Sequence, residues 1–245
     1  MAADQTLPFD LAIDRRLPRA SQIYEALRAA ILDLRLKPGD PISENRICRQ
    51  TNVSRTPARE ALIRLEQDGL IEVFPQHGSF IAPISIRSVI EGHFIRQALE
   101  TALIRRAQPH WLTNGAAQAE RIIGAQQAAA EAENPASFYR EDESFHRLFA
   151  AVAEMDGVSK VIKLSNTHLT RVRQLATPLA GHMEEAIADH RAIVDALDAG
   201  HTDDAAEAMR RHLARVFQTV SRLVQHYRQY FGDFTERDLE LLADG

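Results

Sequence analysis

Cysteine is nearly absent from this chain of 245 residues, which has only Cys48. No disulfide can form within the chain, so the disulfide-rich secreted domains are excluded and a reducing cytoplasm is the favoured location. Cys48 lies in a stretch with apolar residues at helical spacing. This setting predicts a packing residue rather than a reactive thiol.

Long apolar runs are also missing. No stretch reaches the roughly 18 to 20 residues that a membrane-spanning helix requires. The first twenty residues mix acids with bases and contain no apolar core of the kind found in signal peptides. We therefore expect residues 1–20 to be a flexible or loosely docked extension.

A net positive charge is lacking as well, since the formal charge is −5. The distribution of charge, however, leaves room for a nucleic-acid partner. Residues 43–64 hold five arginines and two glutamates, whereas acids outnumber bases in residues 85–245. A local basic face is sufficient for phosphate contact, and an acidic remainder limits indiscriminate binding.

The first third of the chain has the pattern of a winged helix-turn-helix. Apolar residues at helical spacing predict a helix over 21–34, and Ser43 is a good N-cap for a short helix over 43–50. After a tight turn at 52–54, Thr56 and Pro57 open a third helix that ends at Gly69. Two strand-like runs, 71–74 and 79–82, then flank a hairpin turn at 75–78. On this pattern alone, a small α+β domain without a nucleic-acid partner stays open as an alternative.

Residues after 84 have helical periodicity throughout. Helices are predicted at 85–108, 114–133, 135–155, 157–176, 181–199 and 203–231, separated by breaks at proline, glycine or asparagine. Short loops between long helices predict an antiparallel bundle. The expected fold is mostly α, with a winged helix-turn-helix (α+β) followed by an all-helical bundle of about six helices. The expected domains are an N-terminal extension (1–20), a DNA-binding domain (21–84), a helical domain (85–232) and a C-terminal tail (233–245).

Several motifs carry a resemblance to a known family. They are Pro38-Gly39-Asp40, Ser43-Glu44, Val53-Ser54-Arg55-Thr56-Pro57-Ala58-Arg59-Glu60-Ala61-Leu62 and Leu65-Glu66-Gln67-Asp68-Gly69-Leu70-Ile71. Together they resemble the N-terminal domain of GntR-family transcription regulators. The helical remainder, including Phe94-Ile95-Arg96-Gln97-Ala98-Leu99-Glu100, resembles the FCD domain of the FadR subfamily. The resemblance covers nearly the whole chain beyond residue 20.

The third helix would read DNA in the major groove, where its opening turns face the base edges. Arg55 and Arg59 lie four residues apart on one helix face, and each guanidinium can pair with guanine. The other expected contacts are to phosphate or a thymine methyl by Ser54 and Thr56, to phosphate by Arg46 and Arg49, and to the minor groove by His77 and Gly78 at the wing tip. Glu60 is expected to orient an arginine. Some relatives carry arginine where this chain has Asn45, which removes one DNA contact and alters the expected operator preference.

Four residues match the metal pattern of the FCD family: Asp142, His146, His190 and His212. Taken alone, the Asp142–His146 pair at i, i+4 is equally explained as a hydrogen-bonded pair. The resemblance across all four positions implies a divalent transition metal in the bundle. Zinc is the first choice for such ligands, and nickel, iron and manganese are the other candidates.

An effector site is implied beside the metal. Arg96 stands where relatives often place a cationic group, and a guanidinium suits a carboxylate. A salt bridge between Arg96 and Glu100 is the competing explanation. Asn166 and Arg171 are further candidates for the effector cavity.

The sequence thus predicts a homodimeric repressor that binds a palindromic operator. A small carboxylate or sugar acid is expected to change its affinity for that operator. No GxSxG motif and no glycine-rich phosphate loop occurs, so we do not expect an enzyme. Two alternatives stay open: a metal-dependent enzyme acting on an organic acid with an accessory DNA-binding domain, and an architectural DNA-binding protein with a structural metal.

Overall fold

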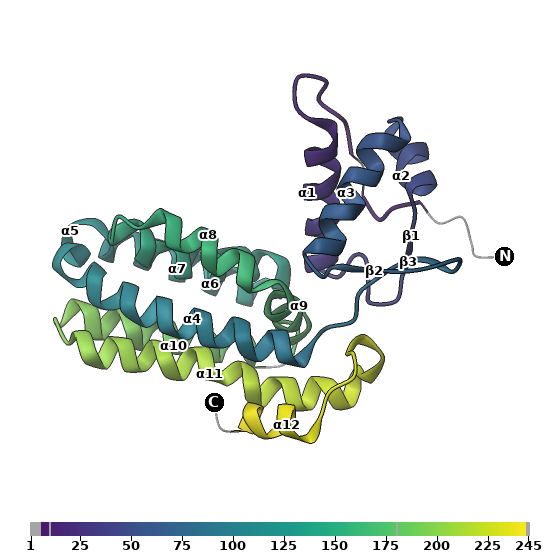
Figure 1. Ribbon diagram of the computed structural model, residues 1–245. Coiled ribbons are helices and arrows are strands. Elements are labelled where there is room, and N and C mark those ends of the chain that lie inside the picture. The colour runs from purple at the N-terminus through teal and green to yellow at the C-terminus, as the bar shows by residue number, and fades with distance from the viewer. Residues whose placement is uncertain (1–5, 10, 180, 244–245) are drawn as a thin grey trace. The chain divides into compact units, whose positions relative to one another are not determined.

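The computed structural model describes residues 6–9, 11–179 and 181–243 (Figure 1). Parts of the expected N-terminal extension and C-terminal tail, together with Ala180 in the expected break at 178–181, lie outside the described residues. The chain forms two compact units. The first runs to Ser85 and includes residues 227–233, and the second comprises residues 86–226 and 234–245.

The first unit has the expected winged helix-turn-helix fold. Its elements are α1 (Arg19–Leu32), β1 (Pro41–Ile42), α2 (Glu44–Thr51), α3 (Arg55–Gln67), β2 (Ile71–Phe74) and β3 (Gly78–Ile81). The sheet has the order β1-β3-β2 and both pairs are antiparallel, with Phe74 opposite Gly78 at the hairpin end. Strand β1 has only two residues, too few for an alternating pattern, which is why the sequence did not reveal it.

The core of the first unit is formed by the predicted apolar stripe of α1 packed on α3. Ile23, Leu27 and Ile31 are almost fully buried, as are Ala58 and Leu65 on the inner face of α3. Leu34, the expected end of the first helix, instead lies beyond α1 with a positive φ of 59°. Leu36 takes the next core position after the helix ends.

The N-terminal segment docks on this unit through α2. The Leu7 side chain is buried in the core, and its backbone N–H donates to the Gln50 side chain at 2.5 Å. The Gln50 amide donates in turn to the carbonyls of Leu7 and Phe9. These bonds fix the described part of the segment against the second helix of the motif.

A second segment joins the first unit from the far end of the chain. Residues 227–233 contain the short 3-10 helix η2 (Arg228–Tyr230) and then pair with the residues that follow the wing. Ile84 forms a parallel bridge with Phe231: its N–H donates to the Tyr230 carbonyl at 2.8 Å, and its carbonyl accepts from Gly232 at 3.0 Å. Ile84 and Phe231 are both buried. The expected bounds place residues 227–232 in the helical domain, whereas their backbone bonds tie them to the first unit.

The second unit is the expected helical bundle. Its elements are α4 (Ile86–Ala107), η1 (Gln108–His110), α5 (Trp111–Asn114), α6 (Ala116–Glu131), α7 (Pro135–Val152), α8 (Asp156–Ser165), α9 (Thr167–Ala176), α10 (His182–Asp198), α11 (Thr202–His226) and α12 (Glu236–Ala243). Helices α6 and α7 pack together, as do α10 and α11, and α4 contacts α7, α8, α9 and α11 (Figure 1). Helix α4 therefore lies where it can supply side chains to the interior of the bundle. None of the described helices is long and apolar enough to cross a membrane.

The bundle core is aromatic. Trp111, Phe145 and Phe149 are fully buried, and the Trp111 indole N–H donates to Asp198 at 2.6 Å. The rings of Phe145 and Phe149 meet edge to face with centroids 5.1 Å apart. Because Phe145 and Phe149 both lie on α7, their packing fixes the position of the other buried residues of this helix in the bundle.

The single helix expected over 157–176 was wrong, because the chain breaks at Asn166 between α8 and α9. Asn166 leaves the helical conformation with φ −95° and ψ 15°. Helix α4 passes very close to this break: a Cβ added to Gly92 would lie 2.8 Å from the Ser165 carbonyl oxygen. Asparagine favours such breaks because its side chain competes with the helical hydrogen bonds. The last long helix also ends earlier than expected, at His226 rather than 231.

This close approach makes opposite predictions for two helical glycines. We expect Gly92→Ala to destabilise the protein by about 1–3 kcal/mol, because the new methyl group would overlap the backbone oxygen of Ser165. Gly124→Ala in α6 is the matched control, since nothing lies within 4 Å of its added Cβ. It should stabilise by up to about 1 kcal/mol through helix propensity alone. Denaturant unfolding of both variants measures this, and equal effects would contradict the close packing of α4.

Candidate functional site

The outer face of α3 presents the residues expected to contact nucleic acid. Ser54, Arg55, Thr56 and Arg59 are all exposed, whereas Ala58 and the other apolar positions of the helix face the core. The Ser54 side chain makes no capping hydrogen bond. The backbone N–H groups of the first turn therefore remain available to an anion.

A groove runs along this face of the first unit. It is lined by residues of α2 and its N-cap, of α3 and of the wing: Ile42, Ser43, Glu44, Asn45, Arg55, Arg59, Leu62, Ile63, Glu66, Val73, Gly78 and Ser79. The structure thus brings Arg55, Arg59 and Gly78 together, although Gly78 is nineteen positions beyond Arg59 in the sequence. Asn45 lines the same groove, so the position where some relatives carry arginine does face this surface.

The remaining predicted residues lie around the groove. His77 is exposed at the hairpin tip, with its Nδ1 3.0 Å from the Pro75 carbonyl. Arg49 is exposed in the last turn of α2. Arg46 is half-buried, and its guanidinium donates to the carbonyls of Pro41 and Thr6 at 2.8 and 2.9 Å. The bond to Thr6 links Arg46 to the N-terminal segment and the bond to Pro41 links it to β1, so its phosphate contact stays a prediction.

Inside the second unit, four predicted ligands come together from three helices. Asp142 and His146 lie on α7, His190 on α10 and His212 on α11, and one ligand atom of each lies within 4.8 Å of all the others. The Nε2 atom of His212 is 3.3 Å from the Nε2 atoms of both His146 and His190. One oxygen of Asp142 is 3.8 Å from His146 Nε2 and 3.6 Å from His190 Nε2.

The Nδ1 atom of each histidine, on the side of the ring away from the cluster, has a hydrogen-bond partner. The Nδ1 atom of His146 is 2.6 Å from Glu100, that of His190 is 2.9 Å from Gln126, and that of His212 is 3.3 Å from Asp189. These three oxygens accept a hydrogen bond from the Nδ1–H group, which assigns the tautomer and leaves the lone pair of each Nε2 directed at the centre. Acceptors of this kind orient the ligands in metal sites.

The electrostatics of the cluster favour a cation. Burial lowers the pKa of His212 to about 4, and burial, followed by the neighbouring histidines, places the pKa of His190 well below its usual range. His190 and His212 are therefore neutral at pH 7. Three converging lone pairs and a carboxylate repel one another unless a positive charge lies between them, so this donor set fits a divalent metal.

The Asp142 carboxylate is also held by an arginine that the sequence did not single out. The Arg173 guanidinium donates to the second oxygen of Asp142 and, at 2.7 Å, to Glu143. Burial and then the charge of Arg96 lower the pKa of Arg173 to about 10. Two guanidinium groups close together in the interior of the bundle make this region attractive to an anion.

Arg96 is buried rather than exposed, and the ion pair offered as one explanation for it is present, whereas its contact with an effector stays a prediction. Its Nε donates to Glu100 at 2.5 Å, so the predicted i, i+4 ion pair exists. The other oxygen of Glu100 accepts from His146, which links Arg96 to the cluster through one carboxylate. Arg96 also lines the cavity beside the cluster.

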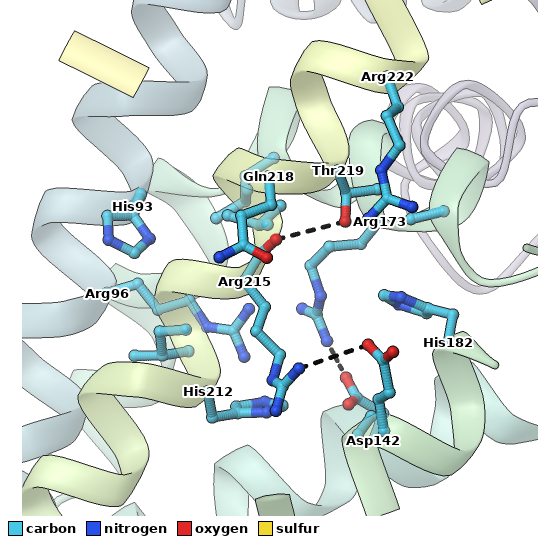
Figure 2. Close-up of a pocket in the computed structure, with 16 residues that line it drawn as sticks. His93, Arg96, Asp142, Arg173, His182, His212, Arg215, Gln218, Thr219 and Arg222 are labelled. Carbon is cyan, nitrogen blue, oxygen red and sulfur yellow. Dashed lines mark hydrogen bonds and ion pairs between the residues drawn. The ribbon is translucent and has the colours of Figure 1, made fainter. Parts of the chain in front are cut away.

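A cavity opens from the four-residue cluster and is lined by α4, α7, α9, α10 and α11 (Figure 2). Asp142 and His212 contribute to one end of it, and His93 lies on the opposite side. The guanidinium groups of Arg96 and Arg173 reach into the space between them. The arrangement can hold a small anion against both a bound metal and two fixed positive charges.

The other two effector candidates lie elsewhere. Asn166 lines a second cavity, of about 570 Å³, together with Arg96 and His146, and its Oδ1 is buried without a hydrogen-bond partner among the described residues. Arg171 is fully buried in α9 and lines neither cavity. Their contact with an effector stays a prediction.

Sequence reasoning missed the residues that hold the ligands. Gln126 precedes His190 by 64 positions, and no local pattern connects them. Asp189 and Arg173 sit among many other charged residues and had no distinguishing spacing. Only Glu100 carried a signal, because it follows Arg96 by one helical turn.

Comparison with known proteins identifies relatives along nearly the whole chain. The model of the bacterial regulatory proteins of the gntR family matches residues 19–81, and that of the FCD domain matches residues 91–215. The chain is 33% identical to the HTH-type transcriptional repressor RspR of Escherichia coli K12 over 216 residues, which is 88% of this chain and 95% of that protein. It is 30% identical to the probable D-xylose utilization operon transcriptional repressor of Paenarthrobacter nicotinovorans, covering 83% of this chain and 90% of the relative.

Solved structures agree on the fold. Escherichia coli McbR/YncC superposes with a TM-score of 0.70 at 20% identity, covering 86% of this chain and 99% of that structure. A GntR regulator from Rhodococcus sp. RHA1 superposes with a TM-score of 0.68 at 23% identity, covering 84% and 99%.

Proposed function

We propose that this protein is a repressor whose operator binding is controlled by a small organic acid bound beside a divalent metal. The chain belongs to the GntR family of bacterial regulatory proteins and carries an FCD domain. It is therefore a transcription regulator and not an enzyme. The observation that carries this proposal is the cavity that places two guanidinium groups next to a four-residue ligand cluster. Repression is supported by the two relatives named as repressors. Its place of action is the cytoplasm, where the DNA lies.

The proposed operator contacts follow from the groove on α3. Arg55 and Arg59 read base edges in the major groove, and each good guanine contact discriminates by about 1–3 kcal/mol. Ser54, Thr56, Arg49 and Arg46 contribute contacts to phosphate, Arg46 after exchanging one of its carbonyl partners. His77 and Gly78 approach the minor groove from the wing tip.

The metal would be held by Asp142, His146, His190 and His212. When bound, it supplies open Lewis-acid positions to which a carboxylate can bind. Three imidazoles and one carboxylate suit zinc first, and also nickel, iron or manganese. Around it, Glu100, Gln126 and Asp189 fix the histidine tautomers, and Arg173 orients the Asp142 carboxylate.

The effector carboxylate would meet Arg96 and Arg173 beside the metal. Each guanidinium group already has a carboxylate partner, Glu100 for Arg96 and Asp142 for Arg173, and each keeps further N–H donors. A small anion therefore gains charge-assisted hydrogen bonds without leaving the arginines' present partners unpaired. Asn166 and Arg171 remain proposed contributors from the α8–α9 region.

We further propose that the protein acts as a homodimer on a palindromic operator, because a two-fold dimer matches a two-fold site. Phe94 on α4 is 69% exposed, and Ala98 and Ala102 continue the same exposed stripe at helical spacing. An exposed aromatic beside small residues suits close packing against a second copy.

The test uses an operator selected from random-sequence duplex DNA by repeated rounds of binding. Fluorescence anisotropy of that labelled duplex measures affinity and stoichiometry with and without a panel of carboxylates and sugar acids. We expect two chains per operator, and at least one acid that changes operator affinity about 5- to 150-fold, the usual range of allosteric coupling.

The same acid should raise the melting temperature of the isolated protein, because it binds the folded state, and chelation should abolish both effects. If no acid changes affinity while the metal is retained, the ion is structural and the proposed control by an acid is wrong. One chain per operator would contradict the dimer.

A further inference from the structure

The chain between the wing and α4 is held in place by a second segment, residues 227–233, which we call the strap. The Ile84 N–H donates to the Tyr230 carbonyl at 2.8 Å, and the Gly232 N–H donates to the Ile84 carbonyl at 3.0 Å. The side chains of Ile84 and Phe231 are both buried. A buried residue whose N–H and carbonyl are both paired is costly to displace. The connection from the wing to α4 is therefore fixed at Ile84 and is not a free linker.

Both ends of the strap continue into helices of the second unit. The strap follows α11, which ends at His226, and leads after Asp233 to α12. Helix α12 contacts both α11 and α4. Ile84 lies two residues before α4 begins at Ile86. The bridge thus joins the chain that enters α4 to the chain that leaves α11.

Helices α4 and α11 also form two walls of the cavity beside the four-residue cluster (Figure 2). The two helices meet where the His93 ring packs on Phe217, with centroids 4.2 Å apart. On α11 the lining extends to Arg222, which precedes the end of the helix by four residues, or about 6 Å along its axis. On α4, His93 follows the first residue of the helix by seven positions, or about 10 Å. The cavity therefore lies between the parts of both helices that lead to the bridge.

The cavity is small enough that a ligand has to move its walls. Its volume is about 70 Å³, so a larger acid enters only by displacing side chains or by separating α4 from α11. Rigid helices carry such a displacement to their ends, and packed elements respond by changing between discrete arrangements. A change in the spacing of α4 and α11 therefore acts on the alignment of Ile84 with Phe231.

We propose that the strap is the joint through which an acid bound between α4 and α11 changes operator affinity. The acid alters the spacing of the two helices, and the strap passes this change to Ile84, three residues beyond the end of the wing strand β3. This inference rests on the proposed acid-responsive function. The gntR match ends at residue 81 and the FCD match covers residues 91–215, so both sides of the joint lie outside the parts of the chain that these two models match.

Lengthening the connection between α11 and the strap tests the joint. Gly-Ser-Gly-Ser inserted between His226 and Tyr227 leaves every residue of the bridge in place but lets α11 move independently, because such linkers are flexible. Anisotropy with the selected operator is measured on the zinc-loaded full-length protein with acetate, lactate, malonate, succinate and gluconate. Operator affinity of the wild type should change about 5- to 150-fold with at least one acid. The variant should bind the operator as the wild type does without acid, and its response should fall to about onefold, the value for uncoupled sites.

The same four residues inserted between Asp233 and Phe234 are the matched control, because α11 stays directly joined to the strap. This variant should keep the response to the acid. If the insertion after His226 leaves the response as strong as in the wild type, or if both insertions abolish it, transmission from α11 through the strap is wrong while the acid-responsive function stands. If no acid changes the operator affinity of the wild type, the proposed control by an acid fails instead.

Hydrogen exchange of the wild type covers the case in which the insertion variants do not fold. Exchange at Ile84 and Gly232 reports opening of the bridge, because both N–H groups donate within it. An acid that changes operator affinity should change both rates by about fivefold or more. Removal of zinc by a chelator is the probe if no acid does so, since His212 of the cluster lies on α11. The Ala82 N–H, which donates to a carbonyl inside the first unit at 2.9 Å, should keep its rate. Unchanged rates at Ile84 and Gly232 would overturn the inference.

Discussion

Replacing Arg59 by alanine is expected to lower affinity for the selected operator by about 5- to 150-fold, corresponding to about 1–3 kcal/mol for one lost guanine contact. The side chain is 73% exposed, and it forms an ion pair with Glu44, with Nε and Oε1 4.0 Å apart. Its removal should leave the fold intact. Anisotropy measured on the operator and on a scrambled duplex separates specific from non-specific binding.

Arg64→Ala is the matched control because it removes the same charge from the same helix. Arg64 stacks on Tyr24 at 3.9 Å and is not among the residues that line the groove. It should lower binding to both duplexes alike and reduce the salt dependence by about one phosphate contact at most. If Arg59→Ala behaves like Arg64→Ala, α3 does not read bases through Arg59.

Replacing His190 and His212 together by alanine is expected to reduce bound metal from about one ion per chain to almost none. Two of four ligands are then missing, and those that remain both lie on α7. The stabilisation that metal gives the folded state, about 3 kcal/mol at a free concentration one hundred times the dissociation constant, is lost with it. Elemental analysis and the melting temperature before and after chelation measure the two effects.

A histidine lining the same cavity but outside the cluster supplies the control: His182→Ala should keep its metal. Gln126→Leu is a milder variant that preserves side-chain volume and removes only the acceptor for His190 Nδ1. It should weaken metal binding about 10- to 100-fold. If the double alanine variant keeps its full metal content, or if chelation still changes its melting temperature as in the wild type, these residues do not form the metal site.

What the sequence predicted correctly depended on local spacing. The signals for the helix-turn-helix and the i, i+4 pair Asp142–His146 each lie within a short stretch of sequence. The helix breaks at proline and glycine are likewise visible without any tertiary contact. The four residues proposed as metal ligands were singled out because a family pattern covers all of them. Their convergence within 4.8 Å is a tertiary fact that spacing alone does not contain.

What could not be predicted depends on contacts between distant segments. Gln126 is no different from other polar residues of an exposed helix until α6 packs beside α10. The break at Asn166 lies where Gly92 of α4 closely approaches the α8–α9 junction, a contact between segments distant in the sequence. His93 has no distinguishing spacing in the sequence, and only its burial and its ring nitrogens, unpaired among the described residues, distinguish it.

The bridge between Ile84 and Phe231 changes what counts as the DNA-binding module. The bridge joins Ile84, which precedes α4, to Phe231, which follows α11. Its formation is therefore a long-range folding event that can occur only after α11 has been synthesised. A gene fragment cut after Ser85 would encode a module without Phe231, and the buried Ile84 would lose both backbone partners. A transplantable version therefore needs the 227–233 segment grafted back, for example through a short linker or as a circular permutant.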